Sequence, residues 1–92
     1  MRVHWTDTAR RHLRAIHAHI AQDSRRYAQR MVDRITRRSQ QIATFPLSGA
    51  MVPEYEIDTI REVIEWPYRI IYEVKPDQID VLAVVHGAQL LS

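Results

Sequence analysis

The run from Ile79 to His86, IDVLAVVH, is the strongest constraint on how this 92-residue chain folds. Apolar side chains fill almost every position of the run, so an extended backbone there has to bury both of its faces. A strand of that kind lies at the centre of a sheet. The chain must therefore supply neighbouring strands and elements that cover the sheet.

The neighbouring strands are visible in the sequence around this run. Residues Thr59–Trp66 and Tyr68–Lys75 alternate along their length, and Pro76–Gln78 forms the turn that leads into the apolar strand. Residues Met1–Trp5 also alternate and form a short strand. The pattern predicts an N-terminal strand and, after a long interval, a three-stranded antiparallel meander.

Two helices fill that interval. Thr6 or Asp7 caps the first helix, which ends at Asp23–Ser24, and the second runs from about Arg25 to Thr44. Each helix has an apolar side at helical spacing. The apolar residues of the first are Ala9, Leu13, Ile16 and Ile20, and those of the second are Tyr27, Ala28, Met31, Val32, Ile35 and Ile42.

These elements predict an α+β fold in which an antiparallel helical hairpin packs on one face of the sheet. The segment FPLSGAMVPEYE reads as a crossover loop between the second helix and the strands, not as a linker between domains. At this length the chain forms one domain, which spans residues 1–92.

The net charge of +2 conceals two halves of opposite sign. From Met1 to Phe45 there are ten arginines and three aspartates, a net charge of +7, whereas Pro46 to Ser92 carries three basic and eight acidic residues, a net charge of −5. Arginine pairs with phosphate or carboxylate in a planar, bidentate way, so the basic half is expected to bind nucleic acid or an acidic protein segment. The arginines expected to contact a partner lie on the polar sides of the two helices: Arg10, Arg14, Arg26, Arg30, Arg34, Arg37 and Arg38.

Several functional classes are disfavoured by composition. The chain has no cysteine, no apolar run of the roughly 20 residues that cross a bilayer, and no apolar signal core near Met1. His12 and His19 are two helical turns apart, about 10 Å, so they cannot bind one metal ion. We expect a cytoplasmic protein without a metal site, a cofactor or a membrane contact.

Four residues in the acidic half have side chains suited to cleaving RNA without a metal. Such a reaction needs a base for the 2′-hydroxyl, cations for the phosphate and an acid for the leaving oxygen. His86 shares a face of its strand with Leu82 and Val84, and each of the two arginines lies opposite the apolar side of its own strand. If the strands align these faces, the groups gather on one sheet surface. The candidate catalytic residues are Glu54, Arg61, Arg69 and His86.

A structural interpretation of the same residues stays open. Arg61 and Arg69 can form cross-strand ion pairs with Glu62, Glu65 or Glu73, each worth less than about 1 kcal/mol, and the histidine can simply end its strand.

Nearly the whole chain resembles the RelE/ParE superfamily of toxins from bacterial type II toxin–antitoxin modules, which includes plasmid stabilisation toxins. The resemblance rests on the order and spacing of five segments: VHWTDTARRHLRAIHAHI, IATFPLSGAMVPE, IREV, YRIIYEV and IDVLAVVHGA. It implies the strand–helix–helix–three-strand order deduced above. It also implies a cognate antitoxin whose C-terminal segment wraps the toxin as a helix and an extended strand, and an acidic segment suits the arginine-rich helices. A homodimer and a hetero-oligomer with the antitoxin are both compatible with the family.

The superfamily contains two activities, and the resemblance implies one of them here. RelE-type members cleave mRNA on the ribosome, and ParE-type members poison DNA gyrase. Glu54, Arg61, Arg69 and His86 match places where the ribonucleases carry functional groups, but IRE and YRIIY occur in ParE-type members as well. The terminal HGAQLLS lacks the tyrosine or lysine cluster common in the ribonucleases and has Gln89 where many relatives carry arginine.

The sequence therefore favours a growth-arresting toxin that binds gyrase and is not an enzyme. A metal-independent, ribosome-dependent endoribonuclease is the alternative, and a non-enzymatic DNA-binding module is a third hypothesis.

Overall fold

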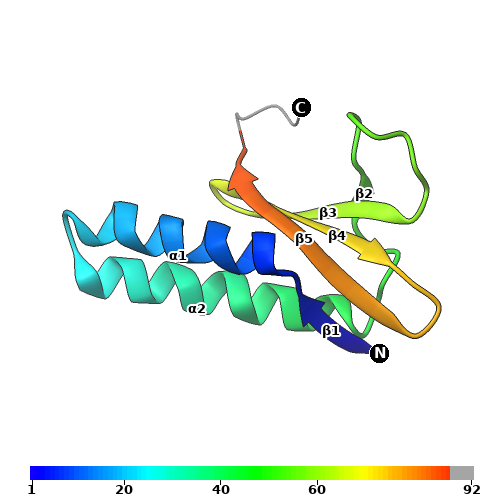
Figure 1. Cartoon of the computed structure of the whole chain (residues 1–92), viewed down its shortest axis with the longest axis horizontal. Coiled ribbons are helices and arrows are strands. Elements are labelled where there is room, and N and C mark those ends of the chain that lie inside the picture. Colours follow the sequence, from blue (N-terminus) through cyan, green and yellow to red (C-terminus); the bar gives the residue numbers. More distant parts are fainter. Residues whose placement is uncertain (88–92) are drawn as a thin grey trace.

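In the computed structural model, which describes residues 1–87, the apolar strand β5 (Gln78–His86) lies inside a five-stranded sheet (Figure 1). The strand order is β1–β5–β4–β3–β2. Strand β1 (Arg2–Trp5) pairs with β5 in parallel, and β4 (Tyr68–Val74) pairs with its other side in antiparallel orientation. Strands β3 (Ile60–Glu65) and β2 (Ala50–Met51) extend the sheet beyond β4, both antiparallel to their neighbours.

The predicted three-stranded meander is confirmed as β3–β4–β5, but the sheet is larger and is mixed in direction. Strand β2 forms within the segment that was predicted to be only a crossover loop. It is two residues long, too short to show an alternating pattern in the sequence. The sheet order places β1, the first strand of the chain, directly beside β5, the last strand.

The two helices form where the sequence predicts them. Helix α1 runs from Asp7 to Ala21 and α2 from Arg25 to Ile42, two residues short of the predicted end at Thr44. The hydroxyl oxygens of Thr6 and Ser24 cap them by accepting backbone N–H bonds of 3.2 and 3.1 Å. The hairpin lies along one face of the sheet and extends beyond it at the α1–α2 turn (Figure 1).

The main core fills the space between this hairpin and the sheet. Leu13 and Ile20 lie at its margin, as the apolar stripe of α1 predicts, but Tyr27 of α2 does not belong to the core because it is 49% exposed. The buried residues of this core are Ala9, Ile16, Met31, Ile35, Ile42, Val63, Tyr68, Ile70, Tyr72, Ile79, Val81 and Val84.

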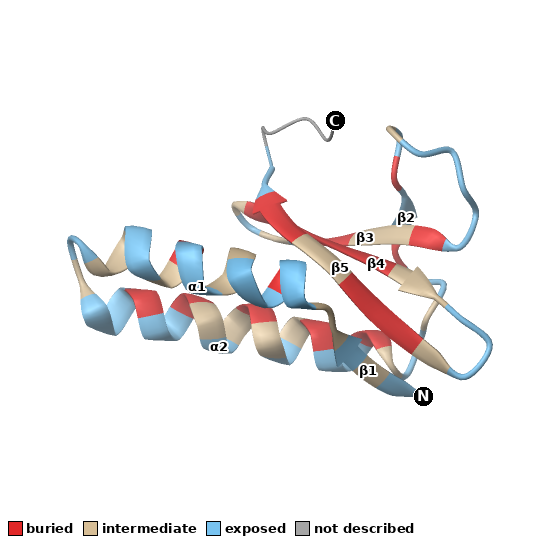
Figure 2. Cartoon of the chain, viewed as in Figure 1, coloured by how far each residue is buried: buried red, intermediate tan, exposed pale blue. Residues whose placement is uncertain are grey.

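A second, smaller core lies on the open sheet face, the face that the helices do not cover. It consists of Val52 from the crossover together with Ile60, Ile71 and Val85 from β3, β4 and β5. The central strands are therefore buried on both sides, whereas the outer sides of the helices are exposed (Figure 2). Val52 brings the start of the crossover onto this face.

A bulge in β5 sets which side chains point to which face. Ile71 pairs with Ala83 and the next residue, Tyr72, pairs with Val81, so Leu82 is the additional residue of β5. The ladder is regular on either side of this position.

The bulge changes the orientation of Leu82 relative to Val84 and His86. Val81 and Val84 both face the helices, although they are three residues apart, because the bulge shifts the alternation by one residue. His86 follows the alternation of Val84 but not that of Leu82, which packs against the open-face core. The predicted common face of Leu82, Val84 and His86 was therefore wrong for Leu82.

The segment between α2 and β2 is fixed by the buried hydroxyl of Tyr72. This hydroxyl donates a 2.8 Å bond to the carbonyl of Pro46 and accepts a 3.1 Å bond from the N–H of Gly49. Burial raises the pKa of the phenol, so the hydroxyl keeps its proton for the donor bond. A Cβ atom on residue 49 would lie 2.4 Å from this hydroxyl oxygen and 2.6 Å from the carbonyl oxygen of Glu62.

Replacing Gly49 with alanine is therefore expected to destabilise the fold. The added methyl has to displace both a buried phenol and a strand carbonyl, at a cost of about 1–3 kcal/mol in the free energy of unfolding. Urea unfolding followed by circular dichroism measures this difference. Ser48→Ala, at the exposed neighbouring position, is the control and is expected to change the free energy by less than about 0.5 kcal/mol. Equal stability of the two variants would contradict the packing described for Gly49.

Candidate functional site

Arg69 lies at the centre of the candidate site. Its neighbours in β4, Tyr68 and Ile70, both face the helices, so the alternation of the strand directs Arg69 to the open sheet face. The residue is only 7% exposed. A buried cation needs anionic partners, because its desolvation otherwise costs several kcal/mol.

Two glutamates supply those partners. Both Nη atoms of Arg69 donate 3.0 Å bonds to the two carboxylate oxygens of Glu54, which makes a bidentate pair. The Nε and Nη2 atoms also donate to Oε2 of Glu62, at 2.9 and 2.6 Å. The hydrogen bonds with Glu54, followed by those with Glu62, raise the pKa of Arg69 despite its burial. The Arg69 cluster, defined as Glu54, Glu62 and Arg69, thus holds a permanently charged guanidinium between two carboxylates.

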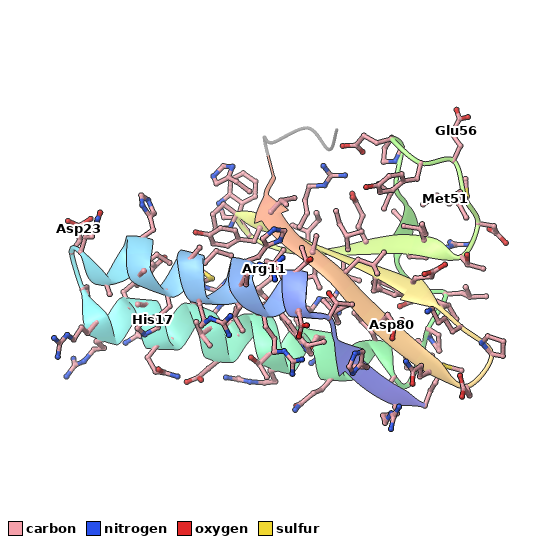
Figure 3. The ribbon with its side chains drawn as sticks, in the orientation of Figure 1. Arg11, His17, Asp23, Met51, Glu56 and Asp80 are labelled. Atoms are coloured by element: carbon pink, nitrogen blue, oxygen red, sulfur yellow. The ribbon has the colours of Figure 1, made fainter. Side chains whose placement is uncertain are left out.

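The cluster joins three separate parts of the chain. Glu62 comes from β3, Arg69 from β4, and Glu54 from the crossover after β2. The crossover projects from the sheet. Glu56 and Met51 lie at one end of the molecule, and Asp23, which belongs to the α1–α2 turn, lies at the opposite end (Figure 3). The bidentate contact of Glu54 therefore ties a long surface segment to the middle of the sheet.

A hollow of about 720 Å³ lies over the cluster. Glu54, Glu62 and Arg69 line it together with apolar side chains from the end of β3, including Ile64 and Trp66. Trp66 is 74% exposed and Ile64 49% exposed. The hollow thus combines carboxylate groups with exposed apolar surface.

Arg61 does not join this site. It lies on the same side of β3 as Val63, which faces the helices, and it pairs across the ladder with Tyr72 of the main core. Its Nε and Nη2 donate 2.8 Å bonds to the backbone carbonyl and carboxylate of Asp58, and its Nη1 donates a 3.1 Å bond to the carbonyl of Gly49. The two guanidinium groups therefore do not gather on one sheet surface, and Arg61 instead links Gly49, just before β2, to Asp58, just before β3.

His86 lies at the rim of the hollow. It is exposed at the end of β5, and its ring makes an edge-on contact with Tyr68 at a centroid distance of 5.9 Å. It also lines a second hollow, of about 380 Å³, on the helix side of the sheet. Of the four candidate catalytic residues, the structure brings Glu54 and Arg69 into direct contact, places His86 nearby and separates Arg61 from them.

The structural interpretation expected cross-strand ion pairs for the two arginines. One of them, between Arg69 and Glu62, is present. The two residues are diagonal neighbours across β3 and β4, because Arg69 pairs directly with Ile64. Sequence reasoning named Glu54 as a catalytic group but missed that it also binds Arg69. A correct register of the β3–β4 hairpin would have predicted the contact with Glu62, but nothing local indicates that the crossover folds back over the sheet.

Another histidine, His12, has a structural role that the sequence did not reveal. Strand β1 ends at Trp5, so within residues 1–87 no strand pairs with β5 on that side from Leu82 onward. Helix α1 lies there, and the N–H of Val84 donates a 3.2 Å bond to Nδ1 of His12. The imidazole thus satisfies a backbone donor at the edge of the sheet.

The arginines of the helices form the second candidate surface. Three of the seven predicted residues have side-chain partners: Arg10 binds Asp7 at 2.9 Å, Arg34 binds Glu65 at 2.7 Å, and Arg38 binds Gln41 at 3.3 Å. The other four make no side-chain hydrogen bond or ion pair within residues 1–87: Arg14, Arg26, Arg30 and Arg37.

Asp33, the only aspartate in α2, does not compensate the positive charge of these arginines. Asp33 accepts a 2.9 Å bond from Gln29 and pairs with no arginine among the described residues. Helix α2 therefore presents an exposed, uncompensated positive surface, which favours a negatively charged partner.

No group of three or more histidine, aspartate or glutamate side chains in residues 1–87 is arranged to hold a metal ion. No helix within the same residues is long and apolar enough to cross a membrane. Gln89, which bears on the expected C-terminal contact, lies outside the described residues.

Comparisons with known proteins give three findings. A sequence profile of the family described as ParE toxin of type II toxin–antitoxin system, parDE, matches residues 3–91. The fold is similar to that of a chain in the chromosomal ParDE TA system from P. aeruginosa, with 25% identity, a TM-score of 0.77 and coverage of 94% of this chain and 95% of that chain. No match was found among curated proteins.

A second solved structure resembles the chain in its fold. It is a chain of the toxin–antitoxin complex RelBE2 from Mycobacterium tuberculosis, with 20% identity, a TM-score of 0.69 and coverage of 92% of this chain and 95% of that chain.

The ion pairs of the Arg69 cluster lead to a prediction about stability. Arg69→Met leaves two largely buried carboxylates without their cation and is expected to lower the free energy of unfolding by about 3–5 kcal/mol. The triple variant Glu54→Gln, Glu62→Gln, Arg69→Met removes the charges as well and is expected to recover most of that loss. Urea unfolding of the two variants and the parent chain measures both effects.

The control is Glu65→Gln, which breaks the more exposed pair with Arg34 and is expected to cost less than about 1 kcal/mol. A triple variant as unstable as Arg69→Met would show that the cost does not come from uncompensated charge.

Proposed function

Since this chain belongs to the ParE toxin family of type II toxin–antitoxin systems, we propose that it arrests bacterial growth by binding and poisoning DNA gyrase. A cognate antitoxin neutralises it. Gyrase acts on chromosomal DNA, so this proposal also assigns the protein to the bacterial cytoplasm. No metal or cofactor takes part, because binding to a protein target needs neither.

The environment of Arg69 is the observation that supports a non-catalytic mode of action. A guanidinium that stabilises the transition state of phosphodiester cleavage has to direct its N–H groups at the phosphate. Those of Arg69 are directed at Glu54 and Glu62. An approaching phosphate would have to displace two carboxylates that repel it. Arg61, the second cation that the reaction would use, lies on the other face of the sheet.

A ribosome-dependent mRNA endonuclease is the second candidate. The observation that favours it is the hollow over the Arg69 cluster, which Glu54, Arg69 and His86 line together. In that reaction the histidine or the glutamate would exchange protons and Arg69 would contact the phosphate. Catalysis would require Arg69 to leave its carboxylate partners, so the function needs a rearrangement on the ribosome.

We propose that the antitoxin binds the arginine surface of α2. Arg26, Arg30 and Arg37 are exposed without side-chain partners in the described chain, and Asp33 does not neutralise them. An acidic antitoxin segment would relieve the repulsion among these arginines, which costs a few tenths of a kcal/mol for each close pair.

Gyrase inhibition is directly testable with purified components. Adding the protein to gyrase, ATP and relaxed plasmid is expected to block the appearance of supercoiled DNA, and the cognate antitoxin is expected to restore it. Because the toxin binds gyrase itself, the inhibition of supercoiling is expected to depend on the toxin concentration and not on the presence of RNA. Agarose gel electrophoresis of the plasmid measures the result. Full supercoiling at micromolar toxin would contradict the proposal.

His86→Ala provides the matched control for the endonuclease candidate. His86 is exposed at the end of β5, so its loss leaves the fold intact, and gyrase inhibition is expected to remain. Cleavage of mRNA on purified ribosomes that disappears in His86→Ala would support the endonuclease instead.

A further inference from the structure

A groove of about 260 Å³ lies between the C-terminal half of α2 and the end of β3. Its walls are Arg34, Arg37, Arg38 and Gln41 of α2 and Glu65 of β3, a set that we call the Arg34 groove. Each of the four helical residues lies three or four positions from two of the others, which places their side chains on one side of the helix. Helix α2 passes under the sheet at this point (Figure 1).

The charge in this groove is unbalanced. Three guanidinium groups face one carboxylate, that of Glu65, which binds Arg34 at 2.7 Å. Arg38 has only the neutral amide of Gln41 as a side-chain partner, at 3.3 Å, and Arg37 has none among the described residues. Two positive charges therefore remain without a counter-ion in a concave site, where the surrounding protein strengthens their field.

Glu65 shows what chemistry the groove accepts. Its carboxylate reaches Arg34 from the neighbouring strand, and the pair is accessible to solvent, with 40% of the arginine side chain and 21% of the glutamate side chain exposed. Accessible ion pairs of this kind are worth less than about 1 kcal/mol, so a competing anion can replace Glu65 at small cost.

We propose that the Arg34 groove binds neighbouring carboxylates of an acidic protein segment, and that Glu65 occupies one of these carboxylate positions until the partner arrives. The partner's carboxylates pair with Arg37 and Arg38 and compete with Glu65 for Arg34. Assigning this segment to the antitoxin rests on the proposed function, whereas the binding itself does not.

The size and shape of the groove favour a peptide over nucleic acid. A volume of about 260 Å³ admits a few side chains, not the backbone of a duplex. Planar guanidinium groups bind carboxylates through two parallel hydrogen bonds, which gives a short acidic peptide a defined register.

Two other helical arginines offer a matched control. Arg11 and Arg25 are exposed, lie outside the groove and are not among the arginines proposed to bind the antitoxin. Removing them changes the net charge of the protein by the same amount as removing Arg37 and Arg38. The two double variants therefore separate the groove from the general positive charge of the helices.

The test uses a fluorescein-labelled hexaglutamate peptide and fluorescence anisotropy with the full chain at low salt. Arg37→Gln with Arg38→Gln is expected to raise the Kd about tenfold, because charge-assisted pairs are lost. Arg11→Gln with Arg25→Gln is expected to raise it only about twofold through the weaker overall field. Glu65→Gln is expected to lower the Kd about twofold, because Arg34 no longer has a competing partner.

Three results would overturn the proposal. They are an equal loss of affinity in the two double variants, a Kd that does not fall in Glu65→Gln, and tighter groove-dependent binding of a short DNA duplex than of the peptide. Urea unfolding verifies that every variant is folded. Gyrase supercoiling is measured separately from peptide binding. A negative result for peptide binding therefore does not contradict gyrase inhibition, and a negative result for gyrase inhibition does not contradict peptide binding by the groove.

Discussion

The guanidinium of Arg69 sits almost without solvent in the middle of the sheet, and a buried cation persists there only with anionic partners. Those partners come from two elements that neighbour β4 in different ways. Glu62 reaches it across the strand ladder, and Glu54 reaches it from the crossover that folds over the open sheet face. These ion pairs tie the crossover to the middle of the sheet, beside the second core and the hollow.

The two faces of the sheet differ because the helices cover only one of them and the alternation of β4 directs Arg69 to the other. One face carries the main core and supports the helical hairpin with its uncompensated arginines. The other carries the Arg69 cluster and exposed apolar residues such as Trp66. The contact that we propose with an acidic segment uses α2, whereas the opposite side of the protein presents apolar and acidic groups.

Much of the fold was predictable from periodicity. The apolar β5, the alternating β3 and β4, and the capped helical hairpin were all predicted, with strand ends correct to within one residue, and the family and the α+β class are confirmed. What failed depends on long-range contacts. The bulge at Leu82 has no local signal, β2 is too short to alternate, and Tyr27 continues an apolar stripe that extends past the sheet that would bury it. Of the Arg69 cluster, the sequence named Glu54 and Arg69 but not their arrangement, because the faces of Arg61 and Arg69 follow from strand register, which neither residue encodes by itself.

If Arg69 serves only to hold the crossover in place, its charge is dispensable for toxicity once the fold is preserved. Inducible expression of the variant Glu54→Gln, Glu62→Gln, Arg69→Met in a bacterial host without the antitoxin measures this most directly. Growth arrest accompanied by a DNA-damage response is the predicted result. Unimpaired growth of cells that contain the folded variant at the level of the parent toxin would contradict it and would show that the Arg69 cluster takes part in the toxic activity.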